Sequence, residues 1–331
     1  MRQPGFWFLA HQEPISRLLQ PLGALYAAAV RFRLQAGQRE RMDFPVISIG
    51  NLNVGGGGKT PAALALGARL IERGQCPHFI SRGYGGKARC PTRVNPAYHN
   101  SAEVGDEPLI LAACAPTWVG SNRAASAYAA ARQGATSVIL DDGHQNPDLA
   151  HDLSIVAVDA RRGFGNGQVI PAGPLRETVD LGLARADILL LTGTEAERSR
   201  FLERWNGHLR VPVVAAYLQP INMGIEWTGE RVVAFAGIAD PERFFRTLAT
   251  LGAELVKTVP LADHACPSER LLHRIAKIAK AERATLVTTE KDSVRLSAVW
   301  RRQILSLPVR LQIESWDEID SRLSDIFNTE R

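Results

Sequence analysis

The fold of this chain is decided by residues 46–61, which read VISIGNLNVGGGGKTP. The apolar run 46–49 predicts a buried strand, and the glycines after it predict a turn that leads into a helix. Glycine lets several backbone amides point inward at one anion, and the helix N-terminus adds partial positive charge. This pattern predicts a phosphate loop in which Lys59 contacts the β- and γ-phosphates of a nucleotide and the Thr60 hydroxyl binds Mg²⁺.

The stretch departs from the strict phosphate-loop pattern at one position. That pattern has glycine at the fifth residue before the Gly-Lys pair, and this chain has Asn53 there. A flexible turn that caps a helix is the alternative interpretation. The strand before the glycines and the Gly-Lys-Thr sequence after them favour the nucleotide site.

Apolar runs alternate with helical patterns along the rest of the chain. Up to Pro220, strands are predicted at 46–49, 77–81, 117–120, 137–141, 154–159 and 187–192, and helices at 61–73 and 122–133. Continuous apolar strands separated by helices predict a mostly parallel α/β sheet with helices on both faces and ligands at its carboxyl edge. Later strands at 232–236, 255–259 and 285–289, with helices at 241–251 and 267–284, predict a smaller α/β domain. The expected division is an N-terminal segment 1–42, a nucleotide-binding domain 43–220 and a C-terminal domain 221–331.

Composition limits the classes of partner. The chain has 331 residues, a net charge of +5 and 45% hydrophobic residues. This mild positive charge suits phosphate-bearing molecules or an anionic membrane surface, and the absence of a dense Lys/Arg tract argues against nucleic acid. The four cysteines form no C-x-x-C pair, which argues against a zinc or redox motif.

Residues 1–42 have a local charge of +4, from six arginines and two glutamates, beside many apolar residues. The longest apolar stretch, 18–30, contains Pro21 and is shorter than the ~20 residues of a spanning helix, and no signal-peptide pattern precedes it. Two interpretations remain open from these residues. The segment is either an amphipathic helix in the headgroup layer of a membrane or one packed on its own domain.

Acidic and polar residues follow several predicted strands. Asp141 and Asp142 end an apolar run and would face the phosphate loop, where they hold Mg²⁺ or simply form a turn. Asp106 and Glu107 lie between glycine and proline, and supply either a base or a helix cap. By itself, His264 is only a loop histidine. Arg82 and Tyr84, among glycines, suit a phosphate or a sugar, or else a mobile surface loop.

The motifs, taken in order, closely resemble those of the tetraacyldisaccharide 4'-kinase family, the lipid A 4'-kinases of Gram-negative bacteria. They occupy residues 50–61, 81–86, 105–108, 141–145, 162–167, 171–177, 236–238, 261–264 and 289–292. The resemblance implies transfer of phosphate from ATP, with Mg²⁺, to the 4'-hydroxyl of a tetraacyldisaccharide 1-phosphate, giving lipid IVA. It also implies a hinge between two domains and peripheral association with the cytoplasmic face of the inner membrane through the N-terminal helix. We expect a monomer.

The resemblance also implies roles for individual residues. Asp106 is the expected catalytic base, paired with His264, and Lys59 and Asp142 complete the catalytic group. The expected nucleotide contacts are Asn53, Val54, Gly55, Gly56, Gly57, Gly58, Lys59 and Thr60. The expected metal ligands are Thr60, Glu107, Asp141 and Asp142. The expected substrate contacts are Ser81, Arg82, Tyr84, Asn166 and Arg176.

Two positions depart from the family pattern. Gly57 stands where the family more often has Thr, Ser or Asn, and His144-Gln145-Asn146 replaces a hydrophobic-Gln-His triplet, which leaves a role for residue 146 in doubt. Two rival classes remain: a phosphate-loop GTPase, metallochaperone or partitioning ATPase, and a nucleotide-gated membrane scaffold. Residues 289–292 have the wrong spacing for a guanine motif, and there is no Cys/His cluster.

Overall fold

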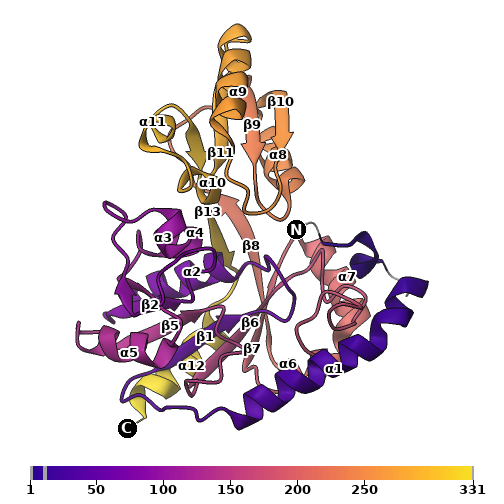
Figure 1. Cartoon of the computed structure of the whole chain (residues 1–331), viewed down its shortest axis with the longest axis vertical. Helices are drawn as coiled ribbons and strands as arrows, with labels where there is room; N and C mark the ends of the chain where they lie inside the picture. Colours follow the sequence, from indigo (N-terminus) through magenta and orange to yellow (C-terminus); the bar gives the residue numbers. More distant parts are fainter. Residues whose placement is uncertain (1–2, 10–12, 330–331) are drawn as a thin grey trace.

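A nine-stranded sheet organises the larger part of the computed structural model, which describes residues 3–9 and 13–329 (Figure 1). Neighbouring strands are parallel except at the two edges, where β3 and β13 run antiparallel to β4 and β8. In spatial order the strands are β13 (Val309–Ile313), β8 (Val213–Pro220), β7 (Ile188–Thr192), β6 (Leu153–Asp159), β1 (Val46–Gly50), β5 (Ser137–Asp141), β2 (Pro77–Ser81), β4 (Thr117–Val119) and β3 (Thr92–Arg93).

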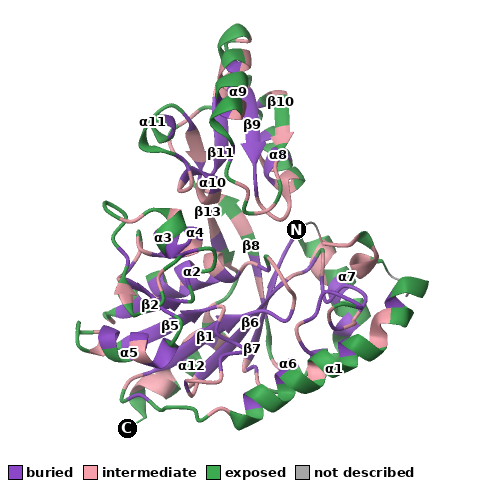
Figure 2. Ribbon diagram, viewed as in Figure 1, coloured by how far each residue is buried: buried purple, intermediate pink, exposed green. Residues whose placement is uncertain are grey.

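Helices cover both faces of this sheet, which confirms the architecture expected from the sequence. One face packs against α2 (Lys59–Glu72), α4 (Asp106–Leu111) and α12 (Asp317–Asn328). The other face packs against α5 (Arg123–Ala131), α6 (Val179–Leu183) and α7 (Glu195–Trp205). The central strands are buried along their whole length (Figure 2), because side chains on both sides of the pleat meet a helix layer.

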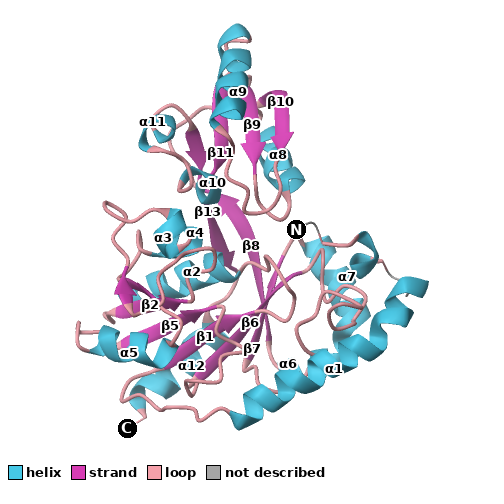
Figure 3. Cartoon of the chain, viewed as in Figure 1, coloured by secondary structure: helices cyan, strands magenta, loops and turns pink. Residues whose placement is uncertain are grey.

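A second, all-parallel sheet stands beyond the carboxyl edge of the first (Figure 3). Its strand order is β10 (Glu254–Pro260), β9 (Arg231–Ala236), β11 (Thr285–Thr289) and β12 (Leu305–Leu307). Apolar side chains of α8 (Pro241–Thr250) cover one face, and those of α9 (Glu269–Ala281) cover the other. The shorter elements of the chain are η1 (Gly5–Phe8), α3 (Ser101–Val104), η2 (Asn206–His208), α10 (Glu290–Ser293) and α11 (Ala298–Arg301).

The end of the chain returns to the large sheet. Strand β13 pairs with β8, and Ile319 and Leu323 of α12 join the core formed by α2 and the central strands. This placement differs from the contiguous range 221–331 expected for the smaller domain. A short apolar run looks the same in sequence whichever sheet it joins, so its partner strand cannot be read from local pattern.

Helix α1 (Pro14–Ala36) lies along the outside of the large sheet's helix layer. Its inner face is fixed by a bond from Ser16 Oγ to the carbonyl of Ala172 (2.8 Å) and by close approach at Gly23, where a Cβ would lie 2.9 Å from Val169 O. Its other face exposes six large apolar side chains: Ile15, Leu18, Leu22, Leu25, Tyr26 and Phe32. Within the described residues, no helix is both long enough and apolar enough to cross a bilayer.

We expect Leu323→Ala to lower the free energy of unfolding by about 2–5 kcal/mol, because it opens a cavity in the large core. Leu202→Ala on α7 is the matched control, since Leu202 is 36% exposed and Leu323 is fully buried. Urea unfolding followed by circular dichroism measures both. Equal effects of the two substitutions would contradict the placement of α12 in this core.

Candidate functional site

The glycine-rich loop closes around the side chain of Lys59. Gly55 and Gly58 adopt positive φ angles of 96° and 81°, which glycine reaches without strain. Lys59 Nζ donates to Gly55 O (3.1 Å) and to Asn51 Oδ1 (3.3 Å), and lies 3.6 Å from Asp142 Oδ1. The ammonium is therefore held beside the loop amides at the start of α2, where a bound phosphate would meet it.

The two unusual loop positions have structural explanations. Asn53 points away from the loop interior and donates to Gly163 O (2.8 Å), so its side chain does not obstruct a phosphate. A Cβ on Gly57 would lie 2.5 Å from Asn51 Nδ2, so Asn51 occupies the space that a larger residue at 57 would need. The expected nucleotide contact of Asn53 is therefore limited to its backbone.

Two carboxylates at the end of β5 face this lysine with different partners. Arg176 binds both oxygens of Asp142, at 2.8 and 3.0 Å. Burial acts to raise the pKa of Asp142, but the charges of Lys59 and Arg176 outweigh it and hold this pKa well below its usual range. Asp142 is thus an anion already paired within the protein.

Asp141 is the unpaired carboxylate of the site. It is 1% exposed, and within the described part of the chain neither of its carboxylate oxygens has a hydrogen-bond partner. Burial, and then the negative charge of Glu107, raise its pKa to about 8. A buried carboxylate without donors fits a cation, which would stabilise its charged form.

The donor set fits Mg²⁺ better than a metal held in a protein cage. Among residues 3–9 and 13–329, no cluster of three His, Cys, Asp or Glu side chains could hold a metal alone. Magnesium typically takes one or two carboxylates and completes its shell with water and substrate phosphates. Asp141 offers one such carboxylate.

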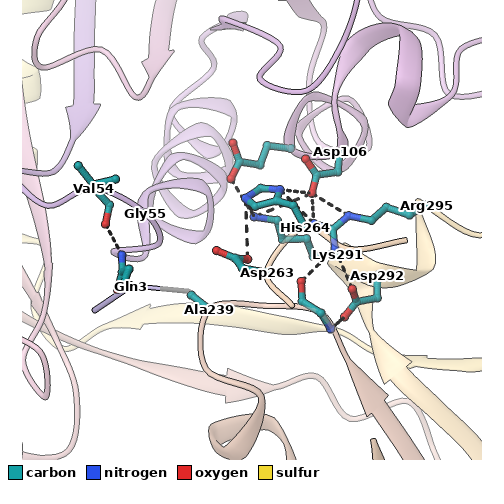
Figure 4. Close-up of polar contacts among 12 residues, drawn as sticks. Gln3, Val54, Gly55, Asp106, Ala239, Asp263, His264, Lys291, Asp292 and Arg295 are labelled. Atoms are coloured by element: carbon teal, nitrogen blue, oxygen red, sulfur yellow. Dashed lines mark hydrogen bonds and ion pairs between the residues drawn. The ribbon is translucent and has the colours of Figure 1, made fainter. Parts of the chain in front are cut away.

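Asp106 and His264 come together from the two sheets (Figure 4). Asp106 opens α4 and is 5% exposed, and His264 follows β10 with a positive φ of 61°. His264 Nδ1 lies 3.3 Å from Asp106 Oδ2. The edge of the Tyr84 ring packs on the imidazole, with ring centroids 5.7 Å apart.

Two cations from the smaller sheet surround this pair. Arg295 donates Nε to Asp106 Oδ2 (3.0 Å), makes a second contact to the same oxygen, and donates to Asp292 Oδ1 (2.9 Å). Lys291 Nζ donates to Glu107 Oε1 (3.0 Å) and lies 3.5 Å from His264 Nε2. Burial acts to raise the pKa of Asp106, but its contact with His264 and the charges of Lys291 and Arg295 keep that pKa far below the usual range.

A cavity of about 290 Å³ lies between the two sheets, and its walls include the phosphate loop together with Glu107 and Lys291, which lie beside the Asp106–His264 pair. Its polar lining includes Lys59, Thr60, Glu107 and Lys291. Further charged residues of the lining are Asp159, Arg162, Asp240, Arg243, Asp263 and Glu290. The apolar lining comes from both sheets: Leu64, Ile110, Leu218, Ile238, Phe244 and Leu307. A cavity with a phosphate loop and apolar walls can take the phosphates and the base of one nucleotide.

The expected substrate residues separate into two groups. Ser81 ends β2 and Arg82 and Tyr84 follow it, and the contact of Tyr84 with His264 brings this loop to the Asp106–His264 pair. Arg176 instead binds Asp142, on the side of the phosphate loop. Asn166 requires a correction, because it is 8% exposed and its amide bonds Ser16 Oγ, Ala172 O and the Gln168 amide. It fastens α1 to its neighbouring loop and has no group left for a substrate.

Several residues of the site were missed from the sequence. Asn51, Lys291 and Asp292 lie inside motifs that were noticed, but no role was given to them. Arg295 lies three residues beyond the last motif, on the same side of a helical turn as Asp292, and only that spacing hinted at it. Lys291 contacts Glu107 and Arg295 contacts Asp106, at separations of 184 and 189 positions, so tertiary structure was needed to find these contacts.

Comparison with known proteins gives consistent similarities. The family model described as "Tetraacyldisaccharide-1-P 4'-kinase" matches residues 15–328. A tetraacyldisaccharide 4'-kinase of Jannaschia sp. (strain CCS1) is 51% identical over 329 residues, covering 98% of this chain and 99% of the relative. One of Dinoroseobacter shibae is also 51% identical, covering 99% and 98%. The crystal structure of LpxK from Aquifex aeolicus in complex with ATP superposes with a TM-score of 0.77 at 25% identity, covering 95% of this chain and 99% of the other.

Asp141→Asn should flatten the pH dependence of stability measured without metal. The folded-state pKa of Asp141 is about 8, above the usual aspartate value of 3.8, so its contribution to stability is present at low pH and is lost as the pH rises through 8. Thermal unfolding in EDTA between pH 5 and 9 measures this slope, and added Mg²⁺ should raise the midpoint of the parent protein more than that of Asp141→Asn. Asp180→Asn is the control, because Asp180 has a side chain that is 75% exposed. An unchanged slope and an equal response to Mg²⁺ would rule out Asp141 as the cation ligand.

Proposed function

Because the chain belongs to the tetraacyldisaccharide-1-P 4'-kinase family, we propose that Asp106 and His264 receive the proton of the 4'-hydroxyl as ATP phosphorylates it. The protein is an ATP-dependent kinase of lipid A biosynthesis, whose acceptor is the tetraacyldisaccharide 1-phosphate and whose product is lipid IVA. The observation that carries the proposed roles is the contact between Asp106 and His264, whose chain neighbours Glu107 and Asp263 line the same cavity as the phosphate loop.

The low pKa of Asp106 is compatible with this role. Phosphoryl transfer passes through a loose transition state, so positioning and charge contribute more than a strong base does. Asp106 would accept a hydrogen bond from the 4'-hydroxyl and orient it toward the phosphate. The proton then passes to the Asp106–His264 pair late in the reaction, and Arg295 keeps the carboxylate ionised until that moment.

Two lysines would stabilise the charge on the transferring group. Lys59 stands at the start of α2, and Lys291 reaches the same cavity from the smaller sheet. When bound, Mg²⁺ would be held by Asp141 and the Thr60 hydroxyl, with Asp142 beside them, and would neutralise phosphate charge. Glu107 accepts a bond from Lys291, so we assign it the role of holding that lysine in place of its expected metal contact.

The exposed apolar face of α1 supports a membrane role. Its leucines at 18, 22 and 25 recur at helical spacing on the side away from the core, and Arg17, Arg31 and Arg33 belong to the same helix. This combination suits a helix lying in the headgroup layer of an anionic membrane. We therefore propose peripheral association with the cytoplasmic face of the inner membrane, where an acylated acceptor would be found. The active unit would be a monomer, because one chain supplies the phosphate loop, Asp106 and His264.

We expect Asp106→Asn to lower kcat by about 10²–10⁴-fold, because the variant keeps the shape of the side chain and loses its charge. The assay measures transfer of labelled phosphate from ATP to tetraacyldisaccharide 1-phosphate, and ATP binding is measured separately and should persist. Asp325→Asn, at an exposed position of α12, is the control. Near-normal turnover of Asp106→Asn would remove Asp106 from the mechanism, and no transfer by the parent protein would reject the proposed reaction.

Replacing Leu18, Leu22 and Leu25 together by serine should weaken binding to vesicles that contain anionic phospholipid by at least about tenfold. Burial of each leucine contributes about 1.5–3 kcal/mol when the whole side chain leaves water. Co-sedimentation measures the bound fraction. Serine at the exposed positions Leu181, Leu202 and Val299 removes a smaller amount of apolar surface outside α1 and should change little. Equal losses in both triple variants would argue against α1 as the membrane contact.

A further inference from the structure

The described residues before α1 lie against the phosphate loop. Gln3 Nε2 donates to the carbonyl of Val54 (2.6 Å), directly before Gly55 (Figure 4). A Cβ on Gly55 would lie 2.6 Å from the same nitrogen, so glycine at 55 makes room for Gln3. The segment is fixed at its other end by Trp7. The Trp7 carbonyl accepts a hydrogen bond from the backbone N–H of Asn166 (2.7 Å), and the Trp7 indole donates to Pro171 O (3.1 Å).

Gln3 also holds an arginine of the nucleotide cavity. Arg162 donates to Gln3 Oε1 (3.1 Å) and to Ala239 O (2.8 Å), and its guanidinium lies 5.4 Å from the centre of the Phe8 ring. Arg162 lines the cavity together with the loop glycines 56–58. It thereby links the N-terminal segment to the cavity wall and to the strand end after β9.

The charge of Arg162 has no carboxylate partner in this arrangement. No Asp or Glu oxygen lies within 4.0 Å of its guanidinium among residues 3–9 and 13–329, whereas the neighbouring Arg161 pairs with Asp240 (2.6 Å). The guanidinium carries five N–H donors, and the two hydrogen bonds above use two of them. A cation with spare donors beside a phosphate loop is suited to a phosphate oxygen.

We propose that Arg162 binds a phosphate group of the bound nucleotide, and that Gln3 is a positioning residue that holds Arg162 and the phosphate loop in register. This inference rests on the proposed nucleotide site and adds a contact supplied by the N-terminal segment. Gln3 uses its two ends separately, because its amide nitrogen holds Val54 and its oxygen holds Arg162. Seating of residues 3–8 and binding of ATP therefore stabilise each other by the same free energy.

The test uses full-length Arg162→Gln, Arg162→Lys and Gln3→Ala. For each, the Kd of Mg·ATP is measured with a fluorescent ATP analogue in detergent without glycolipid, and KM for ATP and for glycolipid is measured in the transfer assay. Arg162→Gln should raise Kd and KM for ATP by about tenfold, since a hydrogen bond to a charged group is lost. Gln3→Ala should raise both about threefold to tenfold, and Arg162→Lys should recover part of the loss. KM for glycolipid should stay unchanged in all three.

Arg204→Gln is the matched control, because Arg204 contacts the loop to which Arg162 belongs. Arg204 reaches Gly165 O from α7 (2.8 Å) and stacks on Trp205, outside the residues that line the cavity. Its ATP affinity should equal that of the parent protein. An equal loss of ATP affinity in Arg204→Gln and Arg162→Gln would show that both substitutions act through the folding of the loop, and would overturn the proposal. An unchanged Kd of Mg·ATP in Arg162→Gln would also overturn it. An effect of Arg162→Gln without one of Gln3→Ala would overturn the role of Gln3.

The outcome also separates this inference from the proposed function. A parent protein that binds ATP but transfers no phosphate to the glycolipid would reject the reaction, while the ATP affinities would still decide the role of Arg162. A parent protein that does not bind ATP would reject both.

Discussion

The buried Lys59 ammonium, held between loop carbonyls and Asp142, is the interaction on which the nucleotide site depends. A charge that is 8% exposed is stable only with partners around it, and the partners come from the loop after β1 and from the residue that follows β5. The parallel sheet brings these strand ends to one edge. Arg176 then pairs with Asp142, which leaves Asp141 as the carboxylate with room for a cation.

The contact between Asp106 and His264 depends on how the two sheets meet. Asp106 belongs to the large sheet's helix layer, whereas His264, Lys291 and Arg295 belong to the smaller sheet and its loops. All three contact the carboxylate of Asp106. A movement of the smaller sheet relative to the larger one would therefore change the charges around Asp106 and its contact with His264 together. The cavity between the sheets would change with it. If the two parts closed on a bound substrate, this movement would bring His264, Lys291 and Arg295 to Asp106 and exclude water from the cavity in a single step.

The N-terminal part of the chain has two separate contacts with this machinery. Helix α1 keeps its polar and small residues toward the protein, at Ser16 and Gly23, and leaves its large apolar side chains outside. The segment before it reaches the phosphate loop through Gln3. One stretch of chain therefore lies between the proposed membrane surface and the nucleotide.

The sequence alone determined the parallel sheet and the phosphate loop, because these depend on local periodicity and on a motif of fixed spacing. The ordered set of motifs determined the family, and the resemblance to that family implied the pairing of Asp106 with His264. The sequence did not determine which residues complete the site. Asn166 lies in a recognised motif but spends its amide on Ser16 and Ala172, while Lys291 and Arg295 reach Asp106 and Glu107 from about 190 residues away. The sequence also did not predict that β13 and α12 return to the large sheet. Local pattern fixes which groups are polar or apolar, whereas only the packed chain decides which polar groups are left without a partner, and those are the groups that can act on a ligand.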